Sequence, residues 1–576
     1  MSFPSPNEKY LDSTAEPNVE SPDAASRPLA EKSPGVVRIE AIASNLGTVT
    51  RTILFVGLFF LGYAFGLDAV LRSVYQTYAT ASYSRHSLLS TVNVIRTVFA
   101  AAAQPTTGKL ADAFGRVETL CLSIVFYLVG SIVEASSNGV TSFCAGAVLY
   151  TLGFTITQTL VEIIIADVTS TRVRLLASYV PNLHFIITAW VSGNISSAVL
   201  GGTTWRWGIG MWCIIFTVLV IPVIATLTFV DVRARRNSPA THVYRWIPLN
   251  KLFWQLDVPG IILLIASLAL LLTPLTIAGG ESPKWRTAHV IAPLVIGFLC
   301  IPIFIFWQMR APHPLVPFSF LKDRGVWGAL GIATFMNFSN SMQSNYLYTV
   351  LIVAFDFSVA AATRIATLFM FTSFLVGPIC GILVYRVRRL KYFIIAGTVL
   401  FLIGFGVLIR YRSGSSGSDH AGVIAAEVIL GIGGGMTPYA SLASMQASLK
   451  HENLGVMTGL FLAFHSIGNA FGTSVAGAMW SQLLPSALVK NLGDPTVAAQ
   501  VYGNPFAVAA QFPVGTEVRT AVIDSFQHVQ RYLCITGLCL SLPMIGFAFC
   551  LRNPVLGRDQ SLVEKKETTT EESVQS

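Results

Sequence analysis

Fourteen stretches of apolar residues recur along the chain, separated by shorter polar segments. A helix needs roughly 20 apolar residues to cross the hydrocarbon core of a bilayer, where its backbone polar groups are satisfied within the helix itself. The pattern therefore predicts an all-α membrane protein with about fourteen transmembrane helices. We expect these helices near residues 51–70, 87–106, 118–136, 140–165, 175–199, 207–230, 256–276, 288–308, 326–353, 363–385, 392–410, 420–442, 455–481 and 530–551.

The composition agrees with a lipid environment. Of the 576 residues, 53% are hydrophobic and only 12% are charged, whereas an ordinary soluble domain is about a quarter charged. The net charge of +9 could suggest nucleic-acid binding, but Lys and Arg lie in short clusters between apolar runs, as membrane topology requires. The eight cysteines contain no CxxC pair, so we expect neither a metal site nor a disulfide framework.

The positions of Lys and Arg also predict the orientation. If both termini are cytosolic, 26 of the 38 basic residues lie inside, 11 lie outside, and Arg96 lies within a helix. The predicted parts are a disordered cytosolic tail at 1–50, a six-helix half at 51–230, a cytosolic linker with two inserted helices at 231–325, a second six-helix half at 326–552 with a long external loop at 482–529, and a cytosolic tail at 553–576.

One loop carries a motif. The segment after the second predicted helix reads Gly108-Lys-Leu-Ala-Asp-Ala-Phe-Gly-Arg116, and a degenerate echo, Gly381-Ile-Leu-Val-Tyr-Arg-Val-Arg-Arg389, follows the tenth. Glycines permit a tight turn, and Asp112 favours the positive end of the next helix dipole. Arg116 can pair with an acid across a cytosolic gate. The alternative is a charged loop that only fixes topology.

The motif resembles the G-x-L-A-D-x-x-G-R loop of the major facilitator superfamily. Such transporters have two six-helix halves, with the solute site near the membrane midplane between them. The resemblance implies the major facilitator fold, here with two additional helices. It also implies a cytosolic gate, for which the candidate residues are Gly108, Asp112, Gly115, Arg116 and Asp167.

Three further segments narrow the resemblance. Arg38-Ile-Glu-Ala-Ile, Gly62-Tyr-Ala-Phe-Gly-Leu-Asp68 and Val94-Ile-Arg-Thr-Val-Phe-Ala-Ala-Ala-Ala-Gln-Pro105 are similar to the fungal siderophore-iron transporter family. This resemblance implies proton-coupled import of ferric siderophores, usually of the hydroxamate type, across the plasma membrane, with endosomal membranes as a second location. The expected partners are the ferric siderophore, protons and the bilayer. We expect a monomer that is not an enzyme and holds no cofactor or metal, because the chelator occupies the coordination sites of the iron.

The main rival is an exporter or exchanger of drugs or other small organic solutes. Fourteen-helix drug–proton antiporters carry a GP-x-x-GG signature in the fifth helix, and the segment from Ala177 to Gly193 lacks it. No G-x-x-x-x-G-K-[ST] loop occurs, so a built-in ATP motor is not expected. A membrane-bound enzyme lacks support from any nucleophile–base motif, and a non-transporting sensor lacks a signalling module.

Ionisable residues inside helices are costly, so each is a functional hypothesis. Arg96 could bind an anionic group of the solute or a carboxylate of a neighbouring helix, or form a fixed salt bridge. Asp68 could contact the solute or be solvated at a helix end. Glu162, with Gln158 on the same face, could trade a proton in each cycle or pair with a cytosolic arginine. The remaining proton-coupling candidates are His184, Glu427 and His465, for which a simple hydrogen bond to a neighbour is the alternative.

A large, partly apolar chelate needs aromatic and amide contacts. The run from Asn337 to Asn345 in the ninth predicted helix would be costly facing lipid, so we expect it to line the cavity. For any single aromatic residue, the alternative to substrate contact is lipid contact or helix packing, which is the more common role. The remaining predicted substrate contacts are Tyr63, Phe65, Trp190, Asn194, Asn337, Gln343, Asn345 and Tyr346.

Overall fold

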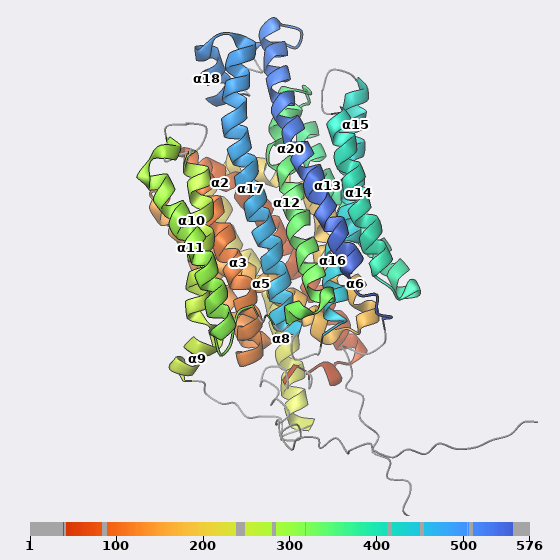
Figure 1. Cartoon of the computed structure of the whole chain (residues 1–576). Helices are drawn as coiled ribbons and strands as arrows, with labels where there is room; N and C mark the ends of the chain where they lie inside the picture. The colour runs from red at the N-terminus through yellow and green to blue at the C-terminus, as the bar shows by residue number, and fades with distance from the viewer. Residues whose placement is uncertain are drawn as a thin grey trace, which may run out of the picture.

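The computed structural model describes residues 38–39, 42–82, 89–237, 248–278, 284–316, 318, 320–411, 417–449, 454–503, 505 and 511–556. Within these residues the regular structure is entirely helical. Long helices lie side by side as one bundle (Figure 1). The predicted tails fall largely on residues 1–37 and 557–576, which lie outside the described residues.

The helices follow the predicted order, with a few breaks. The first group comprises α2 (Thr48–Ser82), α3 (Leu89–Phe114), α4 (Arg116–Ser136), α5 (Val140–Val168), α6 (Thr171–Tyr179), η3 (Val180–Asn182), α7 (His184–Gly202) and α8 (Trp205–Asn237). A central group comprises α9 (Leu249–Leu256), α10 (Val258–Ala278), η5 (Lys284–Arg286), α11 (Ala288–Arg310) and η6 (Phe320–Lys322). The last group comprises α12 (Arg324–Val353), α13 (Val359–Val387), α14 (Lys391–Tyr411), α15 (Gly417–Met436), α16 (Pro438–Gln446), α17 (Leu454–Leu492), α18 (Pro495–Gly503) and α20 (Glu517–Cys550).

The exposed surface of these helices is apolar, as a bilayer requires. In α11, Phe298 is 68% exposed and Met309 is 71% exposed. Only 11% of the most apolar window of α11 is buried by protein. A helix of a soluble protein instead buries its apolar stripe and presents polar residues to water. The chain is therefore a multi-pass membrane protein.

Within the described residues, twelve helical segments are long and apolar enough to cross a membrane, with α6 to α7 and α15 to α16 each counted as one. The helices α3 and α12, with 26 and 30 residues, are not among these twelve. Polar residues lower their hydropathy, among them Arg96 and Asp112 in α3 and the run from Asn337 to Asn345 in α12. The twelve spans support the predicted membrane fold, but they do not confirm a count of fourteen.

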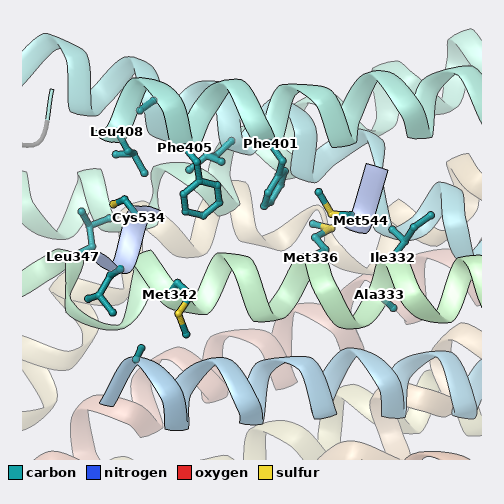
Figure 2. Close-up of a cluster of buried hydrophobic side chains, with 14 of the residues drawn as sticks. Ile332, Ala333, Met336, Met342, Leu347, Phe401, Phe405, Leu408, Cys534 and Met544 are labelled. Carbon is teal, nitrogen blue, oxygen red and sulfur yellow. The ribbon is translucent and has the colours of Figure 1, made fainter. Parts of the chain in front are cut away.

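Two separate hydrophobic cores divide the bundle. One core joins α2, α4, α5 and α8, and the other joins α12 to α17 with α20. Figure 2 shows part of the second core, where Phe401 and Phe405 of α14 point toward α12 and α20. A Cβ atom on Gly537 of α20 would lie against the Phe405 ring, so the glycine permits this close approach. Each group of helices thus has its own packed interior.

The helices α10 and α11 pack against each other beside the two cores. A third apolar cluster joins Leu264, Leu268 and Leu272 of α10 to residues of α3 and to Ala470 of α17. At the start of α10, the buried Asp257 accepts hydrogen bonds from Trp307 and from three other groups. The helices α10 and α11 are therefore joined by these hydrogen bonds, and they lie along the line where α3 meets α17.

The segment 482–529 is more regular than the long loop that the sequence suggests. The helix α17 continues to Leu492, α18 spans Pro495–Gly503, and α20 begins at Glu517. Leu484 and Leu488 are 1% and 0% exposed, so apolar packing continues along α17 past the predicted helix end. A proline at 485 is tolerated within this helix.

Candidate functional site

The two halves meet closely where α3 crosses α17. A Cβ atom on Gly108 would lie 2.5 Å from the carbonyl oxygen of Gly455 and 2.8 Å from the Cα of Val456. One turn further, a Cβ atom on Gly459 would lie 3.0 Å from the Cα of Pro105. Only glycine allows such backbone contact, so this end of the interface, which we call the α3–α17 seam, is closed.

An ionic cluster lies beside the α3–α17 seam. The Arg116 guanidinium lies 2.9 Å from Asp167 and 3.0 Å from Asp112, and it also donates to the carbonyl of Ala111. All three charged side chains are largely buried, and Gly115 supplies the left-handed turn with a φ of 108°. Both acids belong to the same half as Arg116, so these ion pairs do not cross between the halves.

Asp112 makes the contact with the other half. Both of its carboxylate oxygens lie 3.1 Å from the position that a Cβ atom on Gly455 would take, in the first turn of α17. The sequence places Asp112 next to the helix that follows it, but the structure puts it in the last turn of α3, facing α17. A carboxylate at the N-terminus of a helix is stabilised by the free N–H groups and the helix dipole.

The echo of this loop in the second half has different contacts. The helix α13 ends at Val387, and Arg388 takes a left-handed conformation with a φ of 58°. This turn corresponds to that of Gly115. The carbonyl of Arg388 accepts a hydrogen bond from the backbone N–H of Leu556. This turn is therefore held by the segment after α20, whereas the turn at Gly115 lies beside the ion pairs of Arg116.

On the other side of the interface, the predicted fifth helix is broken into α6, η3 and α7. The contacts of this broken segment with the other half form a second seam, which we call the α6–α13 seam. The Tyr179 hydroxyl donates to the carbonyl of Gly435, and its ring lies 4.9 Å from that of Tyr439. Phe185 stacks on Phe374 with ring centroids 4.7 Å apart. Pro181 lies at the break, where its ring removes a backbone donor.

Glu162 of α5 lies beside the α6–α13 seam. It is 6% exposed, and its carboxylate is within hydrogen-bond reach of the Ser178 hydroxyl and the Asn182 amide. Tyr179 and Tyr439 are close enough to interact with it electrostatically, and Tyr439 belongs to the opposite half. Among the described residues, Glu162 has no ion pair with any cation, which leaves it a buried carboxylate held by neutral donors.

The cytosolic arginines proposed as partners of Glu162 are engaged elsewhere. Arg172 donates to the carbonyl of Tyr385 at 3.2 Å, across the α6–α13 seam. Arg174 donates to the carbonyl of Ala166 at 3.0 Å. Gln158 lies one turn before Glu162 on α5 and is half-buried.

Asp68 is not solvated at a helix end, because α2 continues to Ser82. It is fully buried, forms an ion pair of 3.1 Å with Arg72, and accepts hydrogen bonds from the hydroxyls of Tyr127 and Tyr150. Arg72 also pairs with Glu134. These contacts occupy Asp68 fully within the first half, so the predicted solute contact is not supported by its surroundings.

The sequence analysis did not identify Arg72, because the predicted first helix ended at residue 70, and it did not single out Glu134 within the predicted helix at 118–136. The spacing of Asp68 and Arg72, one helical turn apart, would have indicated this ion pair in the sequence. We call Asp68, Arg72, Glu134, Tyr127 and Tyr150 the buried ionic cluster. It joins α2, α4 and α5.

Arg96 lies at the edge of the buried ionic cluster. Its guanidinium donates to Gln76 at 2.6 Å and to Thr151 at 3.1 Å, and it lies 5.2 Å from the centre of the Tyr150 ring. The side chain is half-buried. No ion pair within the described part of the chain neutralises it, so Arg96 can present a positive charge.

Tyr63, Phe65 and His184 form one aromatic group. The ring centroids of Tyr63 and Phe65 lie 6.2 and 6.3 Å from that of His184. His184 is fully buried and shares a hydrogen bond with Thr188, and its ring fills the space that a Cβ atom on Gly66 would need. These contacts are those of a packed interface between α2 and α7.

The polar run of α12 is partly satisfied by its own helix. Asn337 and Asn345 donate to backbone carbonyls one turn earlier, at 2.9 and 2.8 Å. Gln343 is 1% exposed, and Tyr346 stacks on Trp480 with centroids 4.1 Å apart. Gln343 therefore lies between helices of the second half, Asn337 and Tyr346 are half-buried, and Asn345 is exposed.

The other candidates are spread over the bundle. Glu427 is fully buried in α15, and His465 is half-buried on α17. Trp190 and Asn194 are exposed on α7. No group of three His, Cys, Asp or Glu side chains that could hold a metal ion occurs in the described part of the chain.

Two family models match the chain. A family model described as "Major Facilitator Superfamily" matches residues 330–489, and one described as "Sugar (and other) transporter" matches residues 48–249. The chain is 42% identical to "Siderophore iron transporter 1" of Saccharomyces cerevisiae, over 90% of this chain and 84% of the relative. It is 32% identical to "Siderophore iron transporter mirC" of Emericella nidulans, over 90% of this chain and 87% of the relative.

Solved structures share the fold. A crystal structure of the peptide transporter POT in complex with sulfate aligns with a TM-score of 0.51 at 15% identity, covering 88% of this chain and 99% of that chain. A bacterial homologue of the human lysosomal transporter Spinster, in an inward-facing and unoccupied conformation, aligns with a TM-score of 0.51 at 12% identity, covering 87% and 97%. At these identities the likeness concerns the fold alone.

Proposed function

Because the chain belongs to the fungal siderophore-iron transporter family of the major facilitator superfamily, we propose that it imports ferric siderophores. The relatives are named transporters, and the chain is a transporter rather than an enzyme. Within this family assignment, we propose hydroxamate chelates as the cargo and protons as the coupling ion.

The observation that carries the transport mechanism is the position of Glu162 between the halves. Its carboxylate has neutral hydrogen-bond donors from α6 and η3 and a tyrosine from the opposite half, and no described cation pairs with it. A buried carboxylate without a counter-ion is held more easily in its neutral form. Rocking of the halves would change this environment, so a proton can be taken up in one state and released in the other.

The closed seams define the state of the transporter. At the α3–α17 seam the backbones of the two halves touch, and at the α6–α13 seam Tyr179 bonds directly to Gly435. In the proposed orientation, with both termini cytosolic, the segment from Gly108 to Arg116, where α3 ends and α4 begins, lies on the cytosolic side. The closed end is then the inner gate, and the binding site would load from outside.

The membrane topology completes the proposal. Counting α3 and α12 with the twelve apolar spans gives the fourteen helices of the sequence prediction. Both helices are packed among others: α3 lies against α5 and α17, and α12 lies against α17 and α20. Their polar residues are therefore tolerated, because they can face protein instead of lipid. We place the protein in the plasma membrane as a monomer, with endosomal membranes as a second location.

For the substrate contacts we propose a narrower set. Arg96 is half-buried and unpaired by described acids, so it is suited to an anionic part of the cargo, with Gln158 on the neighbouring helix. Asp68 is removed from the set, because its own half occupies it. Tyr63, Trp190 and the amides of α12 remain proposals for contact with the chelate shell.

The test is uptake of radioactive iron from a panel of ferric chelates by cells that lack siderophore uptake. Accumulation from one or a few hydroxamate chelates, abolished by a proton uncoupler, is the expected result. No uptake of any chelate, in cells with the protein at the surface, would contradict import. Uptake that persists with the uncoupler would agree with the proposed cargo but contradict the proposed proton coupling.

A further inference from the structure

A groove of about 460 Å³ lies on the surface of α2 near its N-terminal end. Residues three or four apart on a helix share one face, so the α2 residues of the groove form a stripe along the helix. The walls are mostly apolar, and the polar residues lie in the first turns. The lining consists of Thr48, Arg51, Thr52, Phe55, Val56, Phe59 and Val180.

The break in the predicted fifth helix creates this groove. Pro181 packs so closely on Gly62 that a side chain at position 62 would collide with its backbone, and this contact fixes η3 on α2. Before the break, α6 leaves α2 and packs against α13 and α16 of the other half. Among the described residues, no helix therefore covers this face in the first turns of α2, and Val180 forms one wall.

One end of the groove is positive. Arg51 is exposed, and within the described residues its guanidinium has no hydrogen bond or ion pair. It lies in the first turn of α2, a helix of 35 residues, where the free backbone N–H groups add positive potential. Phe55 and Phe59 continue from there along the apolar part of the groove. A positive end and an apolar body match an anionic head and an acyl chain.

We propose that this groove binds one anionic phospholipid of the surrounding bilayer. The phosphate lies at Arg51, because a guanidinium binds phosphate oxygens with charge-assisted hydrogen bonds. One acyl chain follows Phe55 and Phe59 toward Val180. In the proposed orientation the lipid comes from the cytosolic leaflet, which is rich in anionic lipid. The inference concerns a site outside the transport pathway and does not depend on the identity of the cargo.

The lipid would act on the transport cycle through η3. Val180 forms a wall of the groove, and its neighbour Tyr179 makes the bond to Gly435 in the other half. A lipid in the groove therefore rests on the segment that carries the α6–α13 seam. Its occupancy stabilises the arrangement in which this seam is closed.

The experiment is native mass spectrometry of the full-length protein, purified in detergent and supplied with phosphatidylserine or phosphatidylcholine. Arg51→Gln removes the charge, and Val56→Trp fills the groove while leaving Arg51 in place. The matched control is Arg386→Gln, because Arg386 is also an exposed arginine near the end of a membrane helix, in the last turn of α13, but lies outside the groove. Thermal unfolding of each variant in detergent checks that the fold is retained.

We expect the unmodified protein and Arg386→Gln to retain one phosphatidylserine in preference to phosphatidylcholine. Arg51→Gln should retain about fivefold less phosphatidylserine, the factor expected for one basic residue at an anionic lipid surface. Val56→Trp should lose the lipid as well, and inorganic phosphate should not displace it. Equal retention by Arg51→Gln and the unmodified protein, or undiminished binding by Val56→Trp, would overturn the proposal, as would displacement by phosphate alone.

Discussion

The carboxylate of Asp112, at the end of α3, lies against Gly455 in the first turn of α17. Both oxygens are 3.1 Å from the position that a Cβ atom on Gly455 would occupy. The same carboxylate forms an ion pair of 3.0 Å with Arg116. Asp112 therefore links the charged cluster of the first half to the N-terminus of a helix in the second half, at the end of the interface that we propose as the inner gate.

Asp112→Asn should weaken the closed gate while keeping the shape of the side chain. A carboxylate at a helix N-terminus contributes about 0.3–1 kcal/mol, and up to ~2 kcal/mol where it is partly buried. We expect faster labelling of a cysteine placed at the cytosolic end of α17, and reduced uptake of the ferric chelate. Asp494→Asn is the control, because Asp494 is exposed beside α18. Unchanged labelling of the Asp112 variant would contradict a role at the gate.

Gly108→Val tests the backbone contact at the α3–α17 seam. A Cβ atom at this position would lie 2.5 Å from the carbonyl oxygen of Gly455, so the two helices must separate. We expect uptake per molecule at the cell surface to fall at least about tenfold, the factor that corresponds to ~1.4 kcal/mol. Gly406 of α14 has nothing within 4 Å of its Cβ position, so Gly406→Val should transport normally. Full activity of the Gly108 variant would show that the seam need not close.

Glu162→Gln tests the proposed proton site. The amide is nearly the same size and keeps contact with Ser178 and Asn182, but it cannot take up or release a proton. We expect loss of uncoupler-sensitive accumulation, with binding of the ferric chelate and its exchange across the membrane retained. Glu517→Gln, at the exposed start of α20, is the matched control. Concentrative uptake by the Glu162 variant would assign the coupling to another residue.

Arg72→Met should destabilise the first half, because it leaves Asp68 and Glu134 buried without a cation. Removing one partner of a buried ion pair costs about 3–5 kcal/mol. We expect a lower melting temperature of the purified protein and little of it at the cell surface. Replacing the acids as well, by Asp68→Asn and Glu134→Gln, should recover part of the loss. A melting temperature unchanged by Arg72→Met would show that the buried ionic cluster is not needed for stability.

Tyr179→Phe removes the hydrogen bond to Gly435 but keeps the ring against Tyr439. A neutral hydrogen bond contributes about 0.5–1.5 kcal/mol. We expect the closed arrangement to lose a few-fold in population, seen as faster labelling of a cysteine near Gly435, with normal expression. Tyr392→Phe, exposed on α14, should have no effect. Equal labelling rates for the two variants would show that the Tyr179 hydroxyl does not stabilise the closed arrangement.

Several elements could be predicted because their cause is local. An apolar run must be helical in a bilayer, so most spans follow from the sequence alone. The turn at Gly115 was also predictable, since its φ of 108° favours glycine. Helix ends were less predictable. The predicted first helix ended at residue 70, but α2 continues to Ser82, because Arg72 pairs with the buried Glu134 of α4 and the Tyr75 ring packs against Gly208 of α8.

The sequence by itself determined the membrane class and the family, because apolar runs and motif spacing act over a few helical turns. Tertiary structure alone decided which charges are neutralised. Asp68 is occupied by Arg72, Tyr127 and Tyr150, whereas Glu162 has only neutral donors around it. Both are acids within apolar helices, and only the side chains that the fold brings around them distinguish a structural ion pair from the proposed proton site.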